Sequence, residues 1–277
     1  MGLRISTNVA AINGQRNLSG SQISLNNSLA QLASGSRINK SADDAAGLAI
    51  SESFRGYIRS ARQAGRNAND GISMIQTAEG GLNEMGNIVV RLRELGVQAA
   101  SDTVGDRERS YIDKEVQQLK AELQRISDTT TWGTTKLLDG SSPAFDFQVG
   151  IFNNDTNDRI TFNAGENVAT LEAFNLSDVQ YNTKEGAQGA LQALDEAQNR
   201  INEQRSTLGA LQNRLVSTSN NLGIYEENLS AANSRIRDTD VAAATSEMAR
   251  NNILLQMSTA TLSQANQIPS LALQLLG

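Results

Sequence analysis

LDEAQNRINEQRSTLGALQNRLVSTSNNLGIYEENLSAANSRI, residues 194–236, is the stretch with the strongest periodic pattern in this chain. Its apolar residues recur every seven positions without a miss: Leu194, Ile201, Leu208, Leu215, Leu222, Leu229 and Ile236. A seven-residue repeat places these side chains along one face of an α-helix, where another helix covers them. At about 1.5 Å per residue, the helix is on the order of 65 Å long. Such a helix is typical of a bundle or a fibre.

A second apolar seam follows in a new register, in which Val241, Met248, Leu255 and Leu262 again stand seven residues apart. The register changes at residues 237–240, where Asp238, Thr239 and Asp240 predict the start of a fresh helix. Pro269 predicts a break near its end. The N-terminal third mirrors this pattern with apolar residues at three-and-four spacing, namely Ile5, Val9, Ile12, Leu18, Leu25, Leu29 and Leu32. We therefore expect the two ends of the chain to lie side by side.

The middle of the chain predicts two more helices and a hairpin. Ser41 and Asp44 have the spacing of a capping box, with Ser41 as the N-cap of a long helix. Another helix follows the polar stretch 101–106. Alternating residues at 145–151, an Asn- and Asp-rich turn and a return at 159–162 indicate two strands. The predicted fold class is mainly α, a long antiparallel helical bundle or coiled coil built from both chain ends, with a small β-hairpin element.

The two ends are almost free of charge. From residue 1 to residue 36 only Arg4 and Arg16 have ionisable side chains, and residues 251–277 have none. Exposed helices normally carry many charged residues, so these ends must be covered by each other, by other copies or by a membrane. Asparagines stand there instead, and we interpret them as interface residues in preference to a solvated face. They are Asn8, Asn13, Asn17, Asn26, Asn27, Asn251, Asn252 and Asn266.

Composition argues against several classes of function. The chain has no histidine and no cysteine, so it lacks the commonest general base, the commonest metal ligand and all thiol chemistry. We predict no catalytic, metal or cofactor site, and Asp43 with Asp44 indicates a helix N-terminus. A net charge of −6 argues against binding nucleic acid or anionic lipid. A membrane binder or an intracellular coiled-coil scaffold would need charged residues flanking the apolar faces, which these ends lack. Neither a secretory signal nor a membrane-spanning run is visible.

Several long motifs resemble the signatures of bacterial flagellin. Three lie toward the N-terminus: SLAQLASGSRIN at 28–39, SADDAAGLAIS at 41–51 and NANDGISMIQTAE at 67–79. Three more lie toward the C-terminus: SRIRDTD at 234–240, LSQANQ at 262–267 and LQLL at 273–276. The resemblance covers nearly all of residues 3–140 and 178–277. One departure is Thr131-Trp132-Gly133, where the family usually has a Phe-Asn pair.

The resemblance implies a structural subunit that polymerises into the flagellar filament for motility and catalyses nothing. By it, residues 1–41 plus 241–277 form the axial inner-tube helices, and residues 42–140 plus 178–240 form the helical rod domain. Residues 141–177 hold the hairpin and a short linker that replaces the family's variable outer domains, so this is a minimal form. The alternative is a flagellin-like hook–filament junction protein, which typically has proline where this chain has Ala45.

The seams and the resemblance together give the expected site residues. The polymerisation interface is expected at Ile5, Val9, Ile12, Leu25, Leu29, Leu32, Met248, Leu255 and Leu262. The resemblance implies recognition by a host Toll-like receptor at Arg91, Leu95 and Glu115, and by cytosolic sensors at Leu273, Leu275 and Leu276. Filament packing is also reason enough for these surfaces.

The implied partners are other copies of the chain in a helical filament, hook-associated junction and cap proteins, and a cytoplasmic export chaperone. The resemblance also implies export through the flagellar type III apparatus, guided by an uncleaved N-terminal region. The expected location is therefore the extracellular filament.

Overall fold

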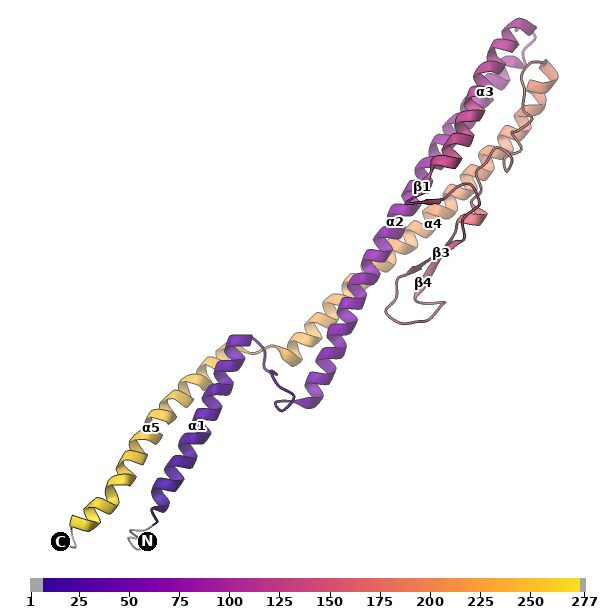
Figure 1. The fold of residues 1–277 in the computed structure, drawn as a ribbon. Helices are drawn as coiled ribbons and strands as arrows, with labels where there is room; N and C mark the ends of the chain where they lie inside the picture. Colours follow the sequence, from indigo (N-terminus) through magenta and orange to yellow (C-terminus); the bar gives the residue numbers. More distant parts are fainter. Residues whose placement is uncertain (1–6, 275–277) are drawn as a thin grey trace. The chain divides into compact units, whose positions relative to one another are not determined.

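Within residues 7–274, which the computed structural model describes (side chains as far as residue 267), five α-helices and two small sheets make up the fold. The helices are α1 (Val9–Ser34), α2 (Ala45–Ala99), α3 (Asp106–Thr129), α4 (Lys184–Arg237) and α5 (Val241–Gln274). The strands are β1 (Thr131–Trp132), β2 (Thr135–Lys136), β3 (Ala144–Gln148) and β4 (Arg159–Asn163), followed by a 3-10 turn at Ala164–Glu166 (Figure 1). The predicted fold class is confirmed.

The chain divides into two compact units. The terminal unit comprises Met1–Gly56 and Asn228–Gly277, and it contains α1 and α5. The central unit comprises Tyr57–Glu227, and it contains α3, the strands and most of α2 and α4. Among residues 7–274, no helix combines the length and the apolar character that crossing a bilayer requires.

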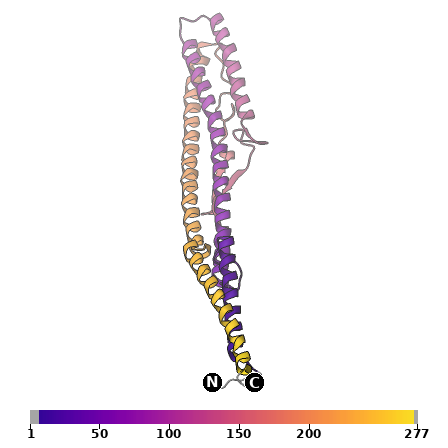
Figure 2. The ribbon, with the colours of Figure 1, turned by 90° about the vertical axis from the view of Figure 1, so that its left-hand side faces the viewer.

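In the central unit, α2 and α4 lie side by side and run in opposite directions (Figures 1 and 2). Two ion pairs mark this register, Arg62 Nε with Glu226 Oε1 at 2.6 Å and Arg93 Nε with Asp195 Oδ1 at 2.6 Å. The first four heptad residues of α4, namely Leu194, Ile201, Leu208 and Leu215, are fully buried, and the last three are half-buried. The helix predicted for residues 194–236 is confirmed.

Two short hairpins follow α3. The predicted one is confirmed, since β3 pairs antiparallel with β4 from Ala144 opposite Asn163 to Gln148 opposite Arg159. The other, β1 with β2, was not predicted. It turns at Gly133, whose φ of 60° favours glycine, and this turn contains the Thr131-Trp132-Gly133 departure.

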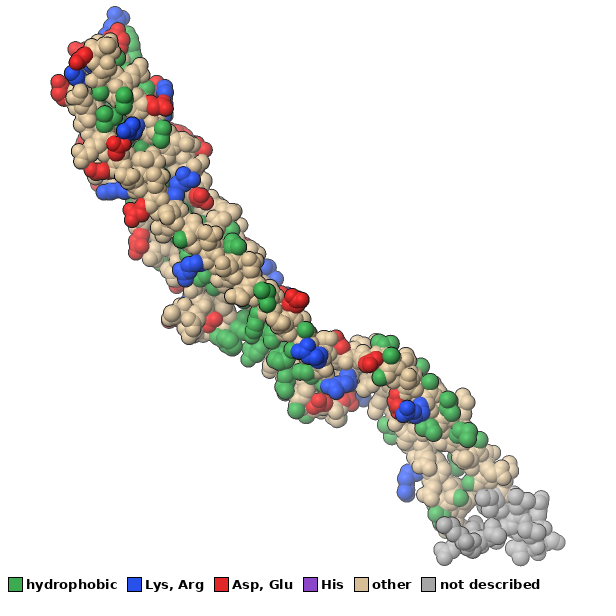
Figure 3. All heavy atoms as spheres, turned by 180° about the vertical axis from the view of Figure 1, so that it is seen from behind, with side chains coloured by type: hydrophobic (Ala, Val, Ile, Leu, Met, Phe, Trp, Pro, Cys, Tyr) green, Lys and Arg blue, Asp and Glu red, His purple; other side chains and the backbone are tan. Residues whose placement is uncertain are grey.

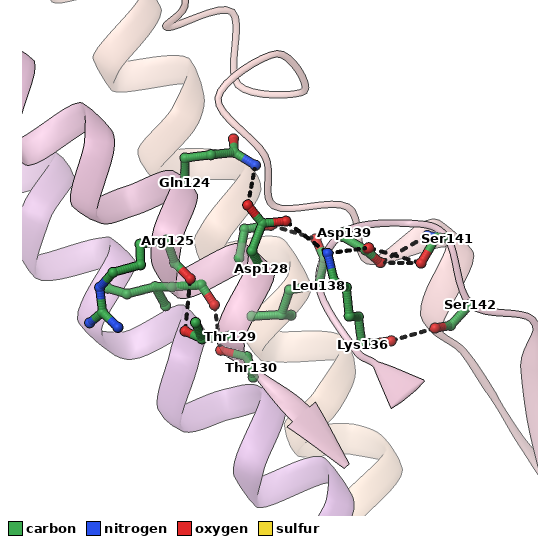
Figure 4. A network of polar contacts seen from close by, with 12 residues as sticks. Gln124, Arg125, Asp128, Thr129, Thr130, Lys136, Leu138, Asp139, Ser141 and Ser142 are labelled. Carbon is green, nitrogen blue, oxygen red and sulfur yellow. Dashed lines mark hydrogen bonds and ion pairs between the residues drawn. The ribbon is translucent and has the colours of Figure 1, made fainter. Parts of the chain in front are cut away.

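Polar contacts attach β2 to the end of α3, as Figure 4 shows. Lys136 Nζ lies 3.0 Å from Asp128 Oδ1 on α3 and 3.4 Å from Asp139 Oδ2 just after the strand. Gln124 Nε2 donates to the other Asp128 oxygen at 3.2 Å. At Asp128, hydrogen bonds from Lys136 and then Gln124 hold the pKa below the ordinary value. At Asp139, burial acts to raise the pKa, but hydrogen bonds from Ser141, followed by that from Lys136, hold it below the ordinary value.

A buried lysine of α3 holds the segment that leads into α4. Lys120 Nζ donates to the carbonyl oxygens of Ser177 at 2.7 Å and Val179 at 3.0 Å. Burial lowers the pKa of Lys120, whereas the charges of Asp113 and Asp178 act in the opposite direction. The ammonium thus joins α3 to two carbonyls of this segment, and Gln117 Nε2 donates a second, longer bond of 3.4 Å to the Val179 carbonyl.

Tyr181 anchors the same segment to α2 and α3. Its N–H donates to Asp113 Oδ1 at 2.8 Å, and its hydroxyl donates to Leu92 O at 2.9 Å. The side chain is fully buried. Burial, with the charge of Asp113 as a smaller cause, raises the pKa of Tyr181 to about 12.

In the terminal unit, α1 and α5 pack antiparallel (Figures 1 and 2). The less exposed positions on each helix alternate at three and four residues, the spacing of a coiled-coil seam. On α1 they are Ala11, Gly14, Leu18, Ser21, Leu25, Ser28 and Leu32, and on α5 they are Ala244, Met248, Asn251, Leu255, Ser258, Leu262 and Ala265. Large and small side chains thus alternate on both helices. The expected pairing of the two chain ends is confirmed.

The large residues of one helix face small residues of the other. A Cβ on Gly14 would lie 3.4 Å from Leu262 Cδ1, so Leu262 packs directly on the glycine. Because both seams repeat every seven residues, the same register places Leu255 level with Ser21 and Leu25 level with Asn251. Asn251 is only 4% exposed, and its Nδ2 finds no hydrogen-bond partner among the residues described.

The start of α2 differs from the expectation. Gly47 N–H donates to Asp44 Oδ1 at 2.8 Å, so Asp44 is the N-cap and the prediction of Ser41 is wrong. Ser41 lies in a turn that Asp43 stabilises by accepting the N–H groups that precede it. A carboxylate accepts hydrogen bonds from main-chain N–H groups better than a hydroxyl does, and two carboxylates, those of Asp43 and Asp44, stand here in succession.

The start of α5 agrees with the expectation, but its end does not. Asp240 Oδ1 accepts from the N–H groups of Ala242 at 2.9 Å and Ala243 at 3.2 Å, so the fresh helix begins where predicted. The break predicted at Pro269 is wrong, because α5 continues to Gln274. A proline within a helix removes one main-chain donor, and another donor can take its place.

We expect replacement of Tyr181 by phenylalanine to remove an alkaline loss of stability. Between the ordinary pKa of 10.0 and the folded value of about 12, the folded chain keeps a proton that the unfolded chain has released. Stability is therefore full below pH 10 and falls as the pH rises toward 12, by on the order of 2 kcal/mol. Urea unfolding of wild type and Tyr181→Phe across this range measures the difference. Parallel pH profiles would contradict the prediction.

We also expect Asn251→Leu to stabilise the α1–α5 pair. The substitution removes a buried amide without a partner and keeps a similar shape, for a gain of about 1 kcal/mol. Circular dichroism of the full chain during thermal unfolding measures it. Asn266→Leu, at an exposed position of the same helix, is the matched control. A less stable Asn251→Leu chain would show that the amide is satisfied.

Candidate assembly surfaces

Among the described residues, the candidate functional features are exposed surfaces of the helices. Among those residues, no three acidic side chains gather as a metal ion would require, and the sequence has no histidine or cysteine. The depressions in the surface are shallow. One follows α1 past Ile12, Arg16 and Ile23. The burial and the contacts of the predicted site residues therefore indicate what they can bind.

Five of the predicted interface residues lie in the seam between α1 and α5. Leu25 is buried and Leu32 is half-buried on α1, while Met248, Leu255 and Leu262 are half-buried on α5. Leu262, for example, packs against Gly14 of the same chain. Most of the surface of these five side chains is therefore already covered within one chain, and only a minor part is left for another molecule to cover.

Three predicted residues point away from the seam. Val9, Ile12 and Leu29 are 56%, 48% and 47% exposed. The structure adds Val241, which the heptad spacing had placed in the seam but which is 61% exposed, and four residues that the sequence reasoning missed because they fall outside the heptad positions. With those three they form what we name the outward apolar set: Val9, Ile12, Ile23, Leu29, Val241, Ile253, Leu254 and Met257. A search for apolar residues at the heptad positions outside the seam would have found these four, which are Ile23, Ile253, Leu254 and Met257.

Charge is sparse around this set. In the described helices, α1 carries only Arg16 and α5 only Glu247 and Arg250, which pair with each other at 3.0 Å. Lysine, arginine and acidic side chains are scattered over the face of the central unit in Figure 3. Exposed apolar residues on helices with so few charges indicate a surface that another molecule covers.

The three residues expected at a receptor contact have different environments. Arg91 on α2 donates to Glu115 Oε1 on α3 at 2.9 Å and to Glu94 Oε2 at 3.0 Å. These bonds, that to Glu115 foremost, raise the pKa of Arg91. Arg91 and Glu115 are exposed and in contact, but Leu95 is 3% exposed and packs in the core. A receptor reaches Leu95 only if the helices above it separate.

Four expected site residues fall outside what the structure describes. Ile5 precedes the described residues, and Leu275 and Leu276 follow them. Leu273 lies on α5, but its side chain is beyond the described ones. Their roles stay predictions.

Two family models together match most of the chain. The model for the bacterial flagellin N-terminal helical region matches residues 5–143, and the model for the bacterial flagellin C-terminal helical region matches residues 191–276. The matches contain α1 to α3 and nearly all of α4 and α5. Between them lie β3, β4, the linker and the start of α4.

Similar proteins agree with this assignment. The flagellin of Halalkalibacterium halodurans is 45% identical over 275 residues, which cover 98% of this chain and 99% of that protein. The flagellin of Bacillus subtilis is 42% identical over 306 residues, covering 99% and 100%. The flagellar filament 33 kDa core protein of Treponema phagedenis is 39% identical over 288 residues, covering 98% and 99%.

A solved structure also agrees, and the alternative function finds no support. The crystal structure of Bacillus cereus flagellin has a TM-score of 0.51 and 28% identity, covering 57% of this chain and 88% of that chain. None of the proteins named is a junction protein. The full-length match to the Halalkalibacterium protein leaves no room for a large inserted domain in either chain. The chain therefore belongs to the bacterial flagellin family and is a structural subunit of the flagellar filament, in a compact form without a variable domain.

Proposed function

We propose that the terminal unit drives polymerisation by covering its outward apolar set with neighbouring copies of the chain. In this proposal, residues 1–41 plus 241–277 form the inner tube of an extracellular filament. Residues 42–140 plus 178–240 form the surrounding rod, and residues 141–177 stand where larger relatives carry outer domains. The observation that supports it best is the exposure of Val9, Ile12 and Leu29 on a helix with almost no charge.

The energetics favour many neighbours over one. Fully burying an exposed Val, Leu or Ile side chain contributes about 1.5–3 kcal/mol, and each residue of the outward apolar set is already partly covered. The set then contributes on the order of 8 kcal/mol, similar to the roughly 4–15 kcal/mol that association costs. A pair of subunits is therefore unstable, and contacts must be shared among several. Contacts that do not close on themselves extend into a helical polymer.

The remaining partners follow from the family resemblance. We propose export through the flagellar type III apparatus, with a cytoplasmic chaperone holding the C-terminal helix beforehand, and assembly between hook-associated junction and cap proteins. Arg91 and Glu115 offer an exposed ion-paired surface for a Toll-like receptor, and Leu273, Leu275 and Leu276 are proposed for cytosolic sensors. The subunit acts through the shape and stiffness of the polymer and catalyses no reaction. Neither nucleic acid nor membrane is a proposed partner.

Ile12→Lys tests the outward surface. Ile12 is 48% exposed, so a lysine fits the isolated chain, but a buried unpaired charge in the polymer costs several kcal/mol. We expect the critical concentration for seeded polymerisation to rise at least about tenfold, equal to about 1.4 kcal/mol. Ile12→Leu, which stays apolar, is the control and should polymerise like wild type. Normal filaments from Ile12→Lys would exclude Ile12 from the interface.

Limited proteolysis tests whether folding of the ends is coupled to assembly. The α1–α5 seam is narrow, so we expect a protease to trim the monomer to roughly residues 45–235. The trimmed core should fail to polymerise even when seeded. Mass spectrometry identifies the fragment, and electron microscopy detects filaments. Termini that resist cleavage in the monomer would contradict the coupling.

A further inference from the structure

The side chain of Asn8 forms hydrogen bonds with both α1 and α5. Its Oδ1 accepts from Ala11 N–H at 3.0 Å, which makes it the N-cap of α1. Its Nδ2 donates to Ala265 O on α5 at 2.8 Å. The second bond joins residues 257 positions apart in the chain.

The acceptor of the second bond has no regular partner in its own helix. In an α-helix, the carbonyl of residue 265 accepts from the N–H of residue 269. Residue 269 is proline, which has no N–H, and α5 nevertheless continues through it to Gln274. Ala265 is only 8% exposed, so its carbonyl would be bare in a poorly hydrated place. Asn8 supplies the hydrogen bond that Pro269 withholds.

We infer that Asn8 and Pro269 position the end of the α1–α5 pair that lies farthest from the linker at residues 238–240. We call this arrangement the lock: the Asn8 amide donates to the Ala265 carbonyl, which Pro269 leaves without its usual main-chain donor. Pro269 makes one carbonyl of α5 available, and the Asn8 amide is placed to find it. Other carbonyls of a regular helix already accept a main-chain N–H, so the proline marks Ala265 as the preferred acceptor. Asn8 is thus a positioning residue for the pair.

The seam alone does not select this alignment. Large and small residues repeat every seven positions on both helices, so a slip of seven residues keeps most of the packing. At the linker end, the Thr239 N–H donates to Gly35 O at 3.0 Å and fixes the alignment there. Asn8 lies on the order of 40 Å away along α1. A second fixed point at that distance holds the two helices in one register along their length.

A cycle of four full-length chains tests the lock, and its link to assembly rests on the proposed function. Asn8→Ser keeps an oxygen that caps α1 but removes the amide donor. Pro269→Ala gives residue 269 an N–H, which then satisfies Ala265 O. Wild type, both single variants and the double variant are compared by their critical concentration for seeded polymerisation. Two further chains, Pro269→Ser alone and combined with Asn8→Ser, supply the same N–H with a different side chain and control for a packing defect.

The lock predicts strong coupling between the two sites. Asn8→Ser should raise the critical concentration about five- to twentyfold when residue 269 is proline, and by about twofold or less when it is alanine or serine. An equal effect in every background would overturn the lock, as would failure of all residue-269 variants to polymerise. A wild-type chain that formed no filaments would instead reject the proposed function. Hydrogen exchange of the α1 amides in the same four chains would then decide on the lock.

Discussion

The contact between large and small side chains along the α1–α5 seam is the constraint on which the terminal unit depends. Leu262 packs on Gly14, and the seven-residue repeat carries that arrangement along both helices. A seam of this kind covers one stripe of each helix. The rest of each helix has neither the charges that would keep it in water nor a second helix to cover it. A single subunit therefore completes only part of the packing that its ends require.

The central unit, in contrast, buries the apolar faces of its helices within one chain. The buried face of α4 packs against α2, α3 and the hairpins, and this core includes Phe162, Phe174 and Tyr181. Charged pairs such as Arg62 with Glu226 lie at its surface, where they contribute little to stability but keep the helices soluble. One chain thus combines a part that is folded by its own core with a part whose outward apolar set stays exposed.

Periodicity predicted the helices well and the surfaces only in part. The repeat from Leu194 to Ile236 determines one long helix because seven-residue spacing puts all its apolar side chains on one helix face, which a neighbouring helix must cover. It does not tell whether a neighbour belongs to the same chain, and so Leu25 and Ile12 were placed in one interface although they face different ways. The small residues of the seam left no apolar signal. The N-cap at Asp44 and the passage through Pro269 depend on hydrogen bonds that spacing does not encode.

The buried ammonium of Lys120 has a consequence for how such chains diversify. By holding the carbonyls of Ser177 and Val179, it fixes the polypeptide immediately before α4. The pairing of β4 with β3 fixes it on the other side. Residues inserted between these two anchors would leave the start of α4 where it is. An insertion there would therefore change the length of the chain without changing the packing of its long helices.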